Sequence, residues 1–241
     1  MTEQILEVEG IQKYYDSHLI INCLSLALSR REIVCLLGPS GCGKTTLFRI
    51  IAGLSKADAG KVRLLPQLRV GYVFQEPRFL PWKRVEENLS FVQRNFLNGS
   101  EAAETRQSLL KDSGLEHFKD NYPDQLSGGM KQRLELIRAL AIRPDFMLLD
   151  EPFKSVDPLL KIKLRKVLLD YQGKYGTSLL LITHDPEEAV LLADRIYLLA
   201  DKPATVIEEI KIGRGQSERT IRQDDIFNYM QMIVKILLHE K

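Results

Sequence analysis

A run of glycines that ends in a lysine and a threonine has a spacing suited to phosphate binding. The run, Gly38–Thr45, reads GPSGCGKT and matches the pattern GxxxxGK[ST]. Glycines allow backbone N–H groups to curl around phosphate oxygens, and the lysine ammonium group reaches the β- and γ-phosphates. We therefore predict a nucleoside triphosphate site. The residues expected to contact the nucleotide are Gly38, Pro39, Ser40, Gly41, Cys42, Gly43, Lys44, Thr45 and Thr46.

Two adjacent carboxylates, Asp150 and Glu151, follow a short apolar run at Phe146–Leu149. Such a run predicts a strand buried on both faces, and open α/β sheets bind ligands at the carboxyl ends of their strands. Beside a phosphate loop, Asp150 is expected to hold Mg²⁺ together with Thr45, and Glu151 to orient or deprotonate the attacking water. Without the loop, the same pattern would equally suit a strand that ends in an acidic surface turn.

The elements that must position these residues alternate between short apolar runs and longer helical patterns. Ile33–Leu37 is predicted to be the strand that leads into the glycine run, and a helix from Thr45 to about Ala52 leaves it. Alternation of this kind is typical of a parallel sheet covered by helices. The other predicted strands are Val70–Phe74, Phe146–Leu149, Ser178–Thr183 and Arg195–Ala200.

The two ends of this α/β core have their own patterns. Residues 5–30 predict a small antiparallel sheet with a turn at Tyr15–His18, and residues 202–212 predict one arm of a late hairpin. A last amphipathic helix is expected to begin at Asp224 or Asp225. Its apolar face packs on the chain's own core or, as the less favoured alternative, on a partner. The residues of this face are Ile226, Met230, Ile233 and Leu237.

The middle of the chain lacks strand patterns from about Val85 to about Ile142. Glycines and prolines separate three helical stretches there, at Glu86–Phe96, Ser100–Asp112 and Gly128–Ile142. We therefore predict one domain in which residues 1–84 and 143–241 form the α/β core. A helical subdomain at 85–142 is inserted into it, and the last helix lies at 224–241.

Composition limits the classes of partner. The 241 residues contain 34 Lys and Arg against 32 Asp and Glu, so a net charge of +2 gives no global field for nucleic acid. The longest apolar stretches are far below the roughly 18 residues of a membrane span. No signal peptide is evident, and three scattered cysteines indicate neither a disulfide framework nor a zinc site. A cytosolic location is therefore expected.

The most specific stretch is Leu126–Arg133, which reads LSGGMKQR. It resembles the signature motif of ABC-transporter ATPases, usually LSGGQ followed by a basic residue, Gln and Arg. Ser127 is suited to cap a helix whose first N–H groups are open to a phosphate. The resemblance implies a P-loop NTPase fold in a head-to-tail homodimer that binds two ATP molecules. Each ATP would contact Lys44 of one subunit and Ser127, Gly128 and Gly129 of the other.

Four further residues match landmarks of this family. The resemblance implies that Tyr15 stacks on adenine, with Tyr14 as the less suitable neighbour, and that Gln75 contacts Mg²⁺ and the attacking water. Asp157 matches the aspartate that crosses the dimer interface. His184 matches the switch histidine near the γ-phosphate, and we expect it at the same sheet edge as Asp150. Together with Lys44 and Glu151, Gln75 and His184 would form the catalytic set.

Two positions depart from the family pattern. Met130 replaces the usual Gln of the signature, a change that keeps the backbone N–H donors. Lys154 stands where the corresponding loop usually has Ser, so that KSVD replaces SALD. A cation at a dimer interface can pair with the partner or perturb the site, and our hypothesis is that it is tolerated.

The stretch from Phe74 to Asn88 reads FQEPRFLPWKRVEEN and resembles the importers of nitrate, sulfonate and taurine. The resemblance implies an ATPase homodimer under two membrane permease subunits, at the cytoplasmic face of the membrane, supplied by an extracytoplasmic solute-binding protein. Arg78–Asn88, with Phe79, Leu80 and Trp82 exposed, would form part of the groove for a permease helix, or Trp82 would simply pack inward. The alternatives are a soluble ABC ATPase of a non-transport process and a catalytically weak binding module.

Overall fold

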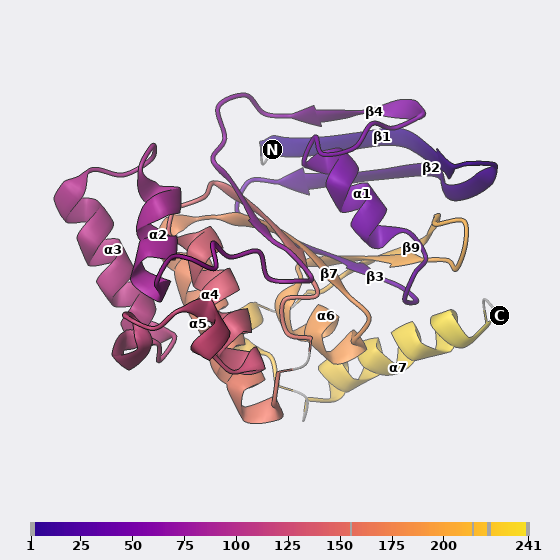
Figure 1. Ribbon diagram of the computed structural model, residues 1–241. Helices are drawn as coiled ribbons and strands as arrows, with labels where there is room; N and C mark the ends of the chain where they lie inside the picture. The colour runs from indigo at the N-terminus through magenta and orange to yellow at the C-terminus, as the bar shows by residue number, and fades with distance from the viewer. Residues whose placement is uncertain (1–2, 155, 214, 221–222, 240–241) are drawn as a thin grey trace. The chain divides into compact units, whose positions relative to one another are not determined.

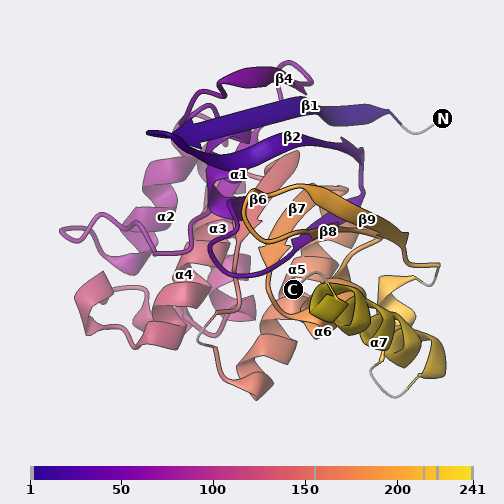
Figure 2. The ribbon, with the colours of Figure 1, turned by 90° about the vertical axis from the view of Figure 1, so that its right-hand side faces the viewer.

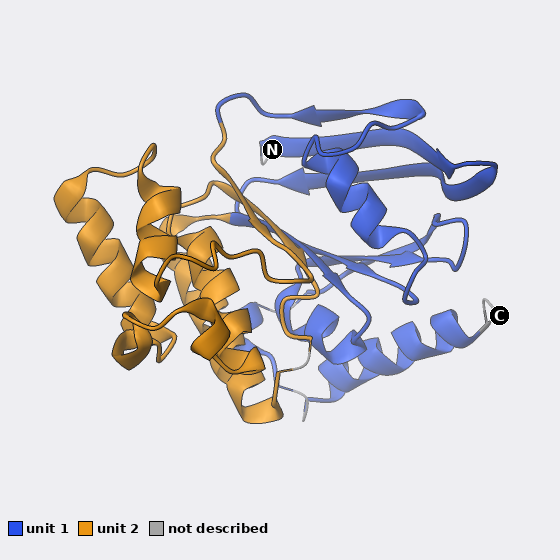
Figure 3. Cartoon of the chain, viewed as in Figure 1, with its two compact units in different colours: residues 1–67, 178–241 blue, residues 68–177 orange. Residues whose placement is uncertain are grey.

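The predicted β-rich ends of the chain come together in the first of two units that make up the protein (Figure 3). The structure is a computed structural model that describes residues 3–154, 156–213, 215–220 and 223–239. Met1–Gln67 and Ser178–Lys241 form unit 1, and Leu68–Thr177 form unit 2. The phosphate loop and the Asp150–Glu151 pair therefore belong to different units.

Unit 1 contains a three-stranded antiparallel sheet in the order β2-β1-β4. β1 (Gln4–Tyr15) and β2 (His18–Ser29) are joined by the predicted turn, and β4 (Ala59–Leu64) is a strand that the sequence did not predict (Figure 1). Four of the six residues of β4 are exposed and charged or small, and β4 lies at the end of its sheet, so it lacks the apolar run of a buried strand.

A second sheet of unit 1 carries the phosphate loop. Its strands lie in the order β7-β3-β8-β9, in which β7 (Ser178–Thr183), β3 (Ile33–Leu37) and β8 (Arg195–Leu199) are parallel. β9 (Val206–Lys211) pairs antiparallel with β8, as the predicted late hairpin requires. β3 and β7 are buried along their whole length, which confirms the prediction from their continuous apolar runs.

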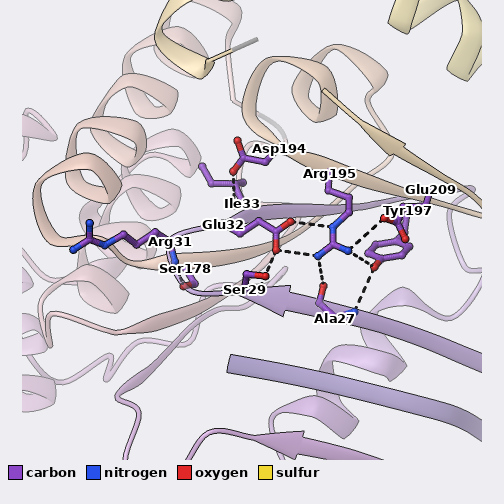
Figure 4. Close-up of polar contacts among 10 residues, drawn as sticks. All are labelled: Ala27, Ser29, Arg31, Glu32, Ile33, Ser178, Asp194, Arg195, Tyr197 and Glu209. Atoms are coloured by element: carbon purple, nitrogen blue, oxygen red, sulfur yellow. Dashed lines mark hydrogen bonds and ion pairs between the residues drawn. The ribbon is translucent and has the colours of Figure 1, made fainter. Parts of the chain in front are cut away.

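An ion-pair network joins β2 to this second sheet (Figure 4). The Arg195 guanidinium group donates two hydrogen bonds of 2.9 Å to the Glu32 carboxylate and one of 3.0 Å to the Ala27 carbonyl. At the neighbouring position, the Asp194 carboxylate accepts from the backbone N–H of Ile33 at 2.9 Å. Burial raises the pKa of Asp194, an effect that this N–H bond opposes. The network fixes the start of β3 and, through it, the strand that leads to the phosphate loop.

In unit 1, one helix packs on the parallel strands β3 and β7, and the last helix packs on that helix (Figures 1 and 2). α1 (Lys44–Ile51) follows the phosphate loop, and α6 (Pro186–Leu192) packs against α7 (Asp224–His239). On α7, Ile226 and Ile233 are fully buried, so the predicted apolar face packs on the chain itself. A short 3₁₀ turn, η3, covers Gln216–Glu218.

Unit 2 contains the parallel pair β5 (Val70–Val73) and β6 (Phe146–Asp150) and most of the helices. The predicted helices are present as α2 (Val85–Gln93), α3 (Gly99–Asp112) and α4 (Gly128–Leu140), which contact one another. The 3₁₀ turns η1 (Glu116–Phe118) and η2 (Pro123–Gln125) precede α4, and α5 (Pro158–Tyr175) follows β6. In the described part of the chain, no helix is long and apolar enough to cross a membrane.

Candidate nucleotide-binding and catalytic site

The phosphate loop leaves a fully buried strand and enters a helix, as the sequence predicts. Leu37 ends β3, residues 38–43 form the loop, and α1 begins at Lys44. No acidic residue lies in the first turn of α1, and no side chain caps it. The first N–H groups of this helix are therefore available to an anion, and the helix dipole favours negative charge there.

Two glycines of the loop have backbone conformations that other residues adopt only with strain. Gly41 has a φ of +80° and Gly43 a φ of +123°. A Cβ atom at Gly43 would also lie 3.1 Å from the side chain and the carbonyl oxygen of Ile20. The glycines thus allow the loop to curl and to approach β2 closely.

Lys44 is buried, with a relative exposure of 5%. Its ammonium group donates to the carbonyl oxygens of Gly38 at 2.8 Å and Pro39 at 2.6 Å, and the thiol of Cys42 lies at 3.8 Å. Carbonyl oxygens compensate the desolvation of the cation without neutralising it. The ammonium charge therefore stays available inside the loop.

His184 leaves the same edge of the sheet as the phosphate loop. In the parallel pair β3–β7, Leu37 is the register partner of Thr183. The first residue of the loop, Gly38, and His184 therefore each follow the last paired position of their strand. His184 is exposed, and the residues after it are fixed by a capped helix. The Asp185 carboxylate accepts from the N–H of Glu187 at 2.9 Å at the start of α6. The unit thus brings together two of the predicted site elements.

Tyr15 lies at the exposed end of β1, beside the turn that leads into β2. Its side chain is 43% exposed, and that of Tyr14 is 42% exposed, so exposure does not distinguish the two. The Lys13 ammonium group lies 5.6 Å from the centre of the Tyr15 ring and 3.1 Å from the Asp58 carboxylate. The Tyr15 ring is therefore accessible, and its stacking on adenine stays a prediction.

Lys202 is a second cation at the loop, which the sequence reasoning missed. It lies in the connection between β8 and β9, and a Cβ atom built on Gly41 would be 4.0 Å from its ammonium nitrogen. The same connection places Ala204 3.4 Å from a Cβ at Gly43. The signal available in the sequence was only the position of Lys202 just beyond a strand of the same sheet.

In unit 2, three predicted site residues lie at one edge of the β5–β6 pair. Val73 is the register partner of Leu149, so Gln75 and Glu151 each lie two residues beyond the paired positions. Asp150 is 2% exposed and Glu151 7% exposed, whereas Gln75 is exposed. Glu151 has a φ of +48°, an uncommon conformation for a residue other than glycine. Strained residues of this kind occur frequently at functional sites.

Lys154 pairs with Glu151 of the same chain. Its ammonium nitrogen lies 2.9 Å from the Glu151 carboxylate, and the two residues also share a backbone hydrogen bond of 3.1 Å. The lysine side chain is 46% exposed and that of Glu151 only 8%. The departure from the family pattern therefore places a cation on the predicted general base. The next residue of this loop, Ser155, is outside the described residues.

The signature stretch forms the start of α4. Ser127 is its N-cap and accepts from the N–H of Met130 at 3.3 Å, which confirms the predicted cap. The first turn has no acidic residue, and Ser127 and Gly128 are exposed. Gln132 donates to the carbonyl oxygen of Pro152 at 2.8 Å, so the helix is fixed to the segment that follows Glu151.

Asp157 has a structural role in its own unit. Its carboxylate accepts from the N–H of Leu160 at 3.0 Å and caps α5. Its side chain is exposed, so capping leaves it accessible. Among the described residues, no group of three or more His, Cys, Asp or Glu side chains could hold a metal ion. The predicted Mg²⁺ ligands are of another kind: one hydroxyl, one amide and one carboxylate, from Thr45, Gln75 and Asp150.

Comparisons with known proteins agree with these features. The family model described as ABC transporter matches residues 21–154. The aliphatic sulfonates import ATP-binding protein SsuB 2 of Pseudomonas syringae pv. tomato is 39% identical over 86% of this chain and 88% of its own length. The taurine import ATP-binding protein TauB of Escherichia coli O157:H7 is 35% identical over 95% of each chain.

Solved structures of ABC cassettes have the same fold. A dimeric structure of MJ0796, a bacterial ABC transporter cassette, has a TM-score of 0.77 and 28% identity, and the match covers 88% of this chain and all of that one. A post-hydrolysis dimer of the same cassette, bound to ADP and phosphate, has a TM-score of 0.76 and 29% identity over the same shares. The motifs, the fold and the relatives together identify this chain as a member of the ABC transporter family, in the group that contains the sulfonate and taurine import ATP-binding proteins.

Proposed function

We propose that this chain is the ATP-hydrolysing subunit that energises a membrane importer of a small solute of the sulfonate or taurine type. The observation that carries the proposal is the phosphate loop, in which backbone N–H groups and a buried ammonium converge at the start of a helix without any acidic residue. The solute class comes from the names of the relatives and not from any residue of this chain, because other subunits select the solute.

The residues of unit 1 are proposed to hold the nucleotide. Lys44 and the backbone N–H groups of Gly38 and of residues 40–46 would bind the phosphates, and Tyr15 would stack on the adenine. His184 would lie near the γ-phosphate, because it leaves the sheet at the same edge as the loop. Stabilising charge on the transferred phosphoryl group is most of the catalysis in reactions of this type.

The residues of unit 2 are proposed to act on the attacking water. Glu151 would accept a proton from it, and Gln75 would orient it. Thr45, Gln75 and Asp150 would hold Mg²⁺, and their oxygen donors are the kind that this cation prefers. Bound Mg²⁺ would neutralise phosphate charge. The buried position of Asp150 at the end of β6 suits a residue that must keep a fixed orientation.

A head-to-tail dimer would complete the site. Ser127 caps a helix whose first turn, at Gly128 and Gly129, has no acidic residue, so the backbone N–H groups there are suited to an anion. We propose that this site contacts the nucleotide of a second copy, and that Asp157 lies at the same interface. The dimeric cassette structures among the similar proteins support this arrangement.

Arg78–Asn88, together with a groove of unit 2 that Arg138 lines close to Phe79, is proposed to receive a helix of the permease. The groove has a volume of about 460 Å³, and its exposed aromatic residues are Phe91, at 45%, and Phe96, at 46%. Trp82, in the loop before α2, is 70% exposed and therefore does not pack inward. The predicted exposure was wrong for Phe79 and Leu80, which are half-buried. Asn88 holds the Leu80 backbone against α2, and the Arg138 guanidinium group lies 5.8 Å from the centre of the Phe79 ring.

These partners define the location we propose. The chain would be a peripheral protein at the cytoplasmic face of the membrane, held there by the permease and supplied by an extracytoplasmic solute-binding protein. The helical subdomain boundaries, 85–142, stay a prediction.

Hydrolysis by the purified chain tests the enzymatic part. Wild-type protein should release phosphate from ATP when Mg²⁺ is present, and Lys44→Ala should lose both nucleotide affinity and turnover. Lys211→Ala, an exposed lysine of β9, is the control. Equal activity of Lys44→Ala and the control would contradict the proposal.

The permease contact needs a separate experiment in cells. Phe91→Ala combined with Trp82→Ala should leave the hydrolysis rate of the isolated chain unchanged and abolish sulfonate-dependent growth or taurine uptake, because both rings are exposed and Phe91 lines the groove. Co-purification of membrane permeases with the wild-type chain, and their loss in the variant, would support the surface. Normal uptake in the variant would contradict the proposed permease contact.

A further inference from the structure

Glu135, a residue of α4 that no motif singles out, is a fully buried carboxylate with an exposure of 0%. Burial raises its pKa, while Arg138 and two backbone N–H groups lower it. A buried charge of this kind is costly unless it is paired and hydrogen-bonded. The contacts that compensate this charge identify the segments that Glu135 joins.

The first contact lies on the same helix. One nitrogen of the Arg138 guanidinium group lies 2.9 Å from each carboxylate oxygen of Glu135. Arg138 is itself largely covered, with a side-chain exposure of 16%. Charge-assisted hydrogen bonds in such surroundings are stronger than neutral ones, so the Glu135 side chain has a fixed orientation.

The second set of contacts reaches the segment that contains Gln75. The backbone N–H groups of Phe74 and Arg78 face the Glu135 carboxylate and lower its pKa. These two residues flank Gln75, Glu76 and Pro77, so one carboxylate holds both ends of a short exposed loop. Gln75 is exposed and lies inside this loop, where its conformation depends on the two fixed ends.

Ring contacts stiffen the same loop. The Arg78 guanidinium group lies 4.5 Å from the centre of the Phe74 ring, which closes the segment on itself. The Phe74 ring stacks on that of Tyr72, with 4.0 Å between the ring centres. Tyr72 belongs to β5, so the first end of the loop is fixed to the sheet as well as to α4.

The Glu135–Arg138 pair also borders the groove proposed for the permease. Arg138, Phe74 and Tyr72 are among the residues that line it. The Arg138 guanidinium group lies 5.8 Å from the centre of the Phe79 ring, just beyond the loop. The groove and the Gln75 loop therefore share residues, and Glu135 contacts both.

Resting on the role proposed above for Gln75, we propose that Glu135 is the positioning residue of the Gln75 loop. Its buried carboxylate fixes the amides of Phe74 and Arg78 and thereby holds Gln75 in the orientation that hydrolysis needs. A plain structural role, in which Glu135 only stabilises the packing of α4, predicts a loss of stability and no specific effect on this loop.

Amide hydrogen exchange of the full-length chain separates the two roles. In Glu135→Ala, exchange of residues 74–78 should become about tenfold or more faster, because charge-assisted bonds to two amides are lost. Gln93→Ala is the matched control, since Gln93 is also buried, at 1%, and donates to the Ala141 carbonyl at 2.9 Å without contacting the loop. The control should lose similar thermal stability and leave exchange at 74–78 unchanged.

Steady-state hydrolysis of ATP with Mg²⁺ supplies the second measurement. Glu135→Ala should lower kcat by about 10-fold to 100-fold, because a misplaced catalytic group has an effect of this size, and should leave KM for ATP nearly unchanged. Glu135→Gln keeps an acceptor oxygen and the shape of the side chain, so it should recover part of kcat and of the slow exchange. This variant also keeps the experiment informative if the alanine variant does not fold.

The two proposals fail in different ways. If Gln75→Ala has wild-type kcat, the role of Gln75 is wrong, whereas exchange at 74–78 still reports whether Glu135 holds the loop. If Gln75→Ala lowers kcat but the Glu135 variants match Gln93→Ala in both exchange and kcat, the positioning role is wrong. Exchange that accelerates in Glu135→Ala and is restored by Glu135→Gln supports it.

Discussion

At the phosphate-loop edge of unit 1, the groups suited to bind an anion come from the backbone, with an ammonium group held by carbonyl oxygens. At the acidic edge of unit 2, the candidate groups are carboxylates: Lys154 pairs with Glu151, and Gln132 of α4 holds the carbonyl of Pro152 beside them. The first edge is specified by eight consecutive residues, and the second depends on contacts between distant segments. Substitutions should therefore act differently at the two edges.

The largest effect is expected at the acidic edge from Glu151→Gln. Removal of the proposed general base should lower kcat by about 10²- to 10⁴-fold and leave ATP binding intact. ATP-bound protein should accumulate as a dimer, which size-exclusion chromatography with and without ATP would measure. Glu116→Gln, at an exposed acid far from the site in sequence, should behave as wild type. Full residual hydrolysis by Glu151→Gln would show that this carboxylate is not the base.

The backbone-built edge should be most sensitive to Gly43→Ala. The substitution puts a Cβ at a φ of +123° and 3.1 Å from Ile20, so the loop must move. Strain of about 1–3 kcal/mol should lower thermal stability, and ATP affinity should fall with it. Gly53→Ala is the control, because its φ is +71° and no atom lies within 4 Å of the added Cβ. Gly53→Ala should lose stability only; an equal loss of affinity in both variants, measured by calorimetry, would contradict the claim.

Much of the fold followed from local patterns. β3 and β7 are continuous apolar runs because both of their faces are buried, and the phosphate loop is a contiguous motif with a strand before it and a helix after it. β4 could not be predicted, since its exposed residues read as a polar connection and its only partner is β1. The predicted strand at Val70–Phe74 ends one residue earlier, at Val73, where the loop held by Glu135 begins.

The site was predictable to the same extent. The Ser127 cap was predictable because a cap is a local feature, and the place of His184 at a strand end because an apolar run precedes it, whereas the roles of both in hydrolysis stay predictions. Lys202 and Glu135 gave no such signal, because each acts on a segment far away in the sequence. Motifs therefore report the chemistry that a short run contains, and the structure adds the residues that hold it in place.

Lys154→Ser is expected to have a smaller effect than either variant above. The ion pair with Glu151 is half-exposed on the lysine side, and such pairs contribute about 0.2–1 kcal/mol. We expect kcat to stay within about fivefold of wild type, which steady-state hydrolysis would measure. An inactive wild type that Lys154→Ser activates would instead show that the lysine blocks the base. Lys154→Arg, which keeps the cation, is the control.

Lys202→Ala tests whether the backbone-built edge also uses a side-chain cation from another strand connection. The lysine is exposed, so its loss should weaken ATP binding by about two- to fivefold, and less at high salt, because exposed charges are screened. Lys202→Arg should bind as wild type, and Lys211→Ala should not matter. Calorimetric titration with ATP at two salt concentrations would measure this, and equal affinities of Lys202→Ala and wild type at low salt would remove Lys202 from the site.

The smallest effect concerns pH and the buried carboxylate of unit 2. Because burial raises the pKa of Glu135 above its ordinary value, the folded chain holds this proton to higher pH than the unfolded chain. The contribution of Glu135 to the free energy of unfolding is therefore fully present below the ordinary glutamate pKa and decreases as pH rises through the raised one. The stability of wild type relative to Glu135→Gln should decline over this window and then level off.

Denaturant unfolding of both proteins at a series of pH values would measure this difference in stability. Glu208→Gln, at an exposed acid of β9, is the control for the general effect of removing an acid. A difference that grows with pH would mean that the bonds from Arg138 and the loop amides outweigh the burial of Glu135, so that the carboxylate stabilises unit 2 in its charged form.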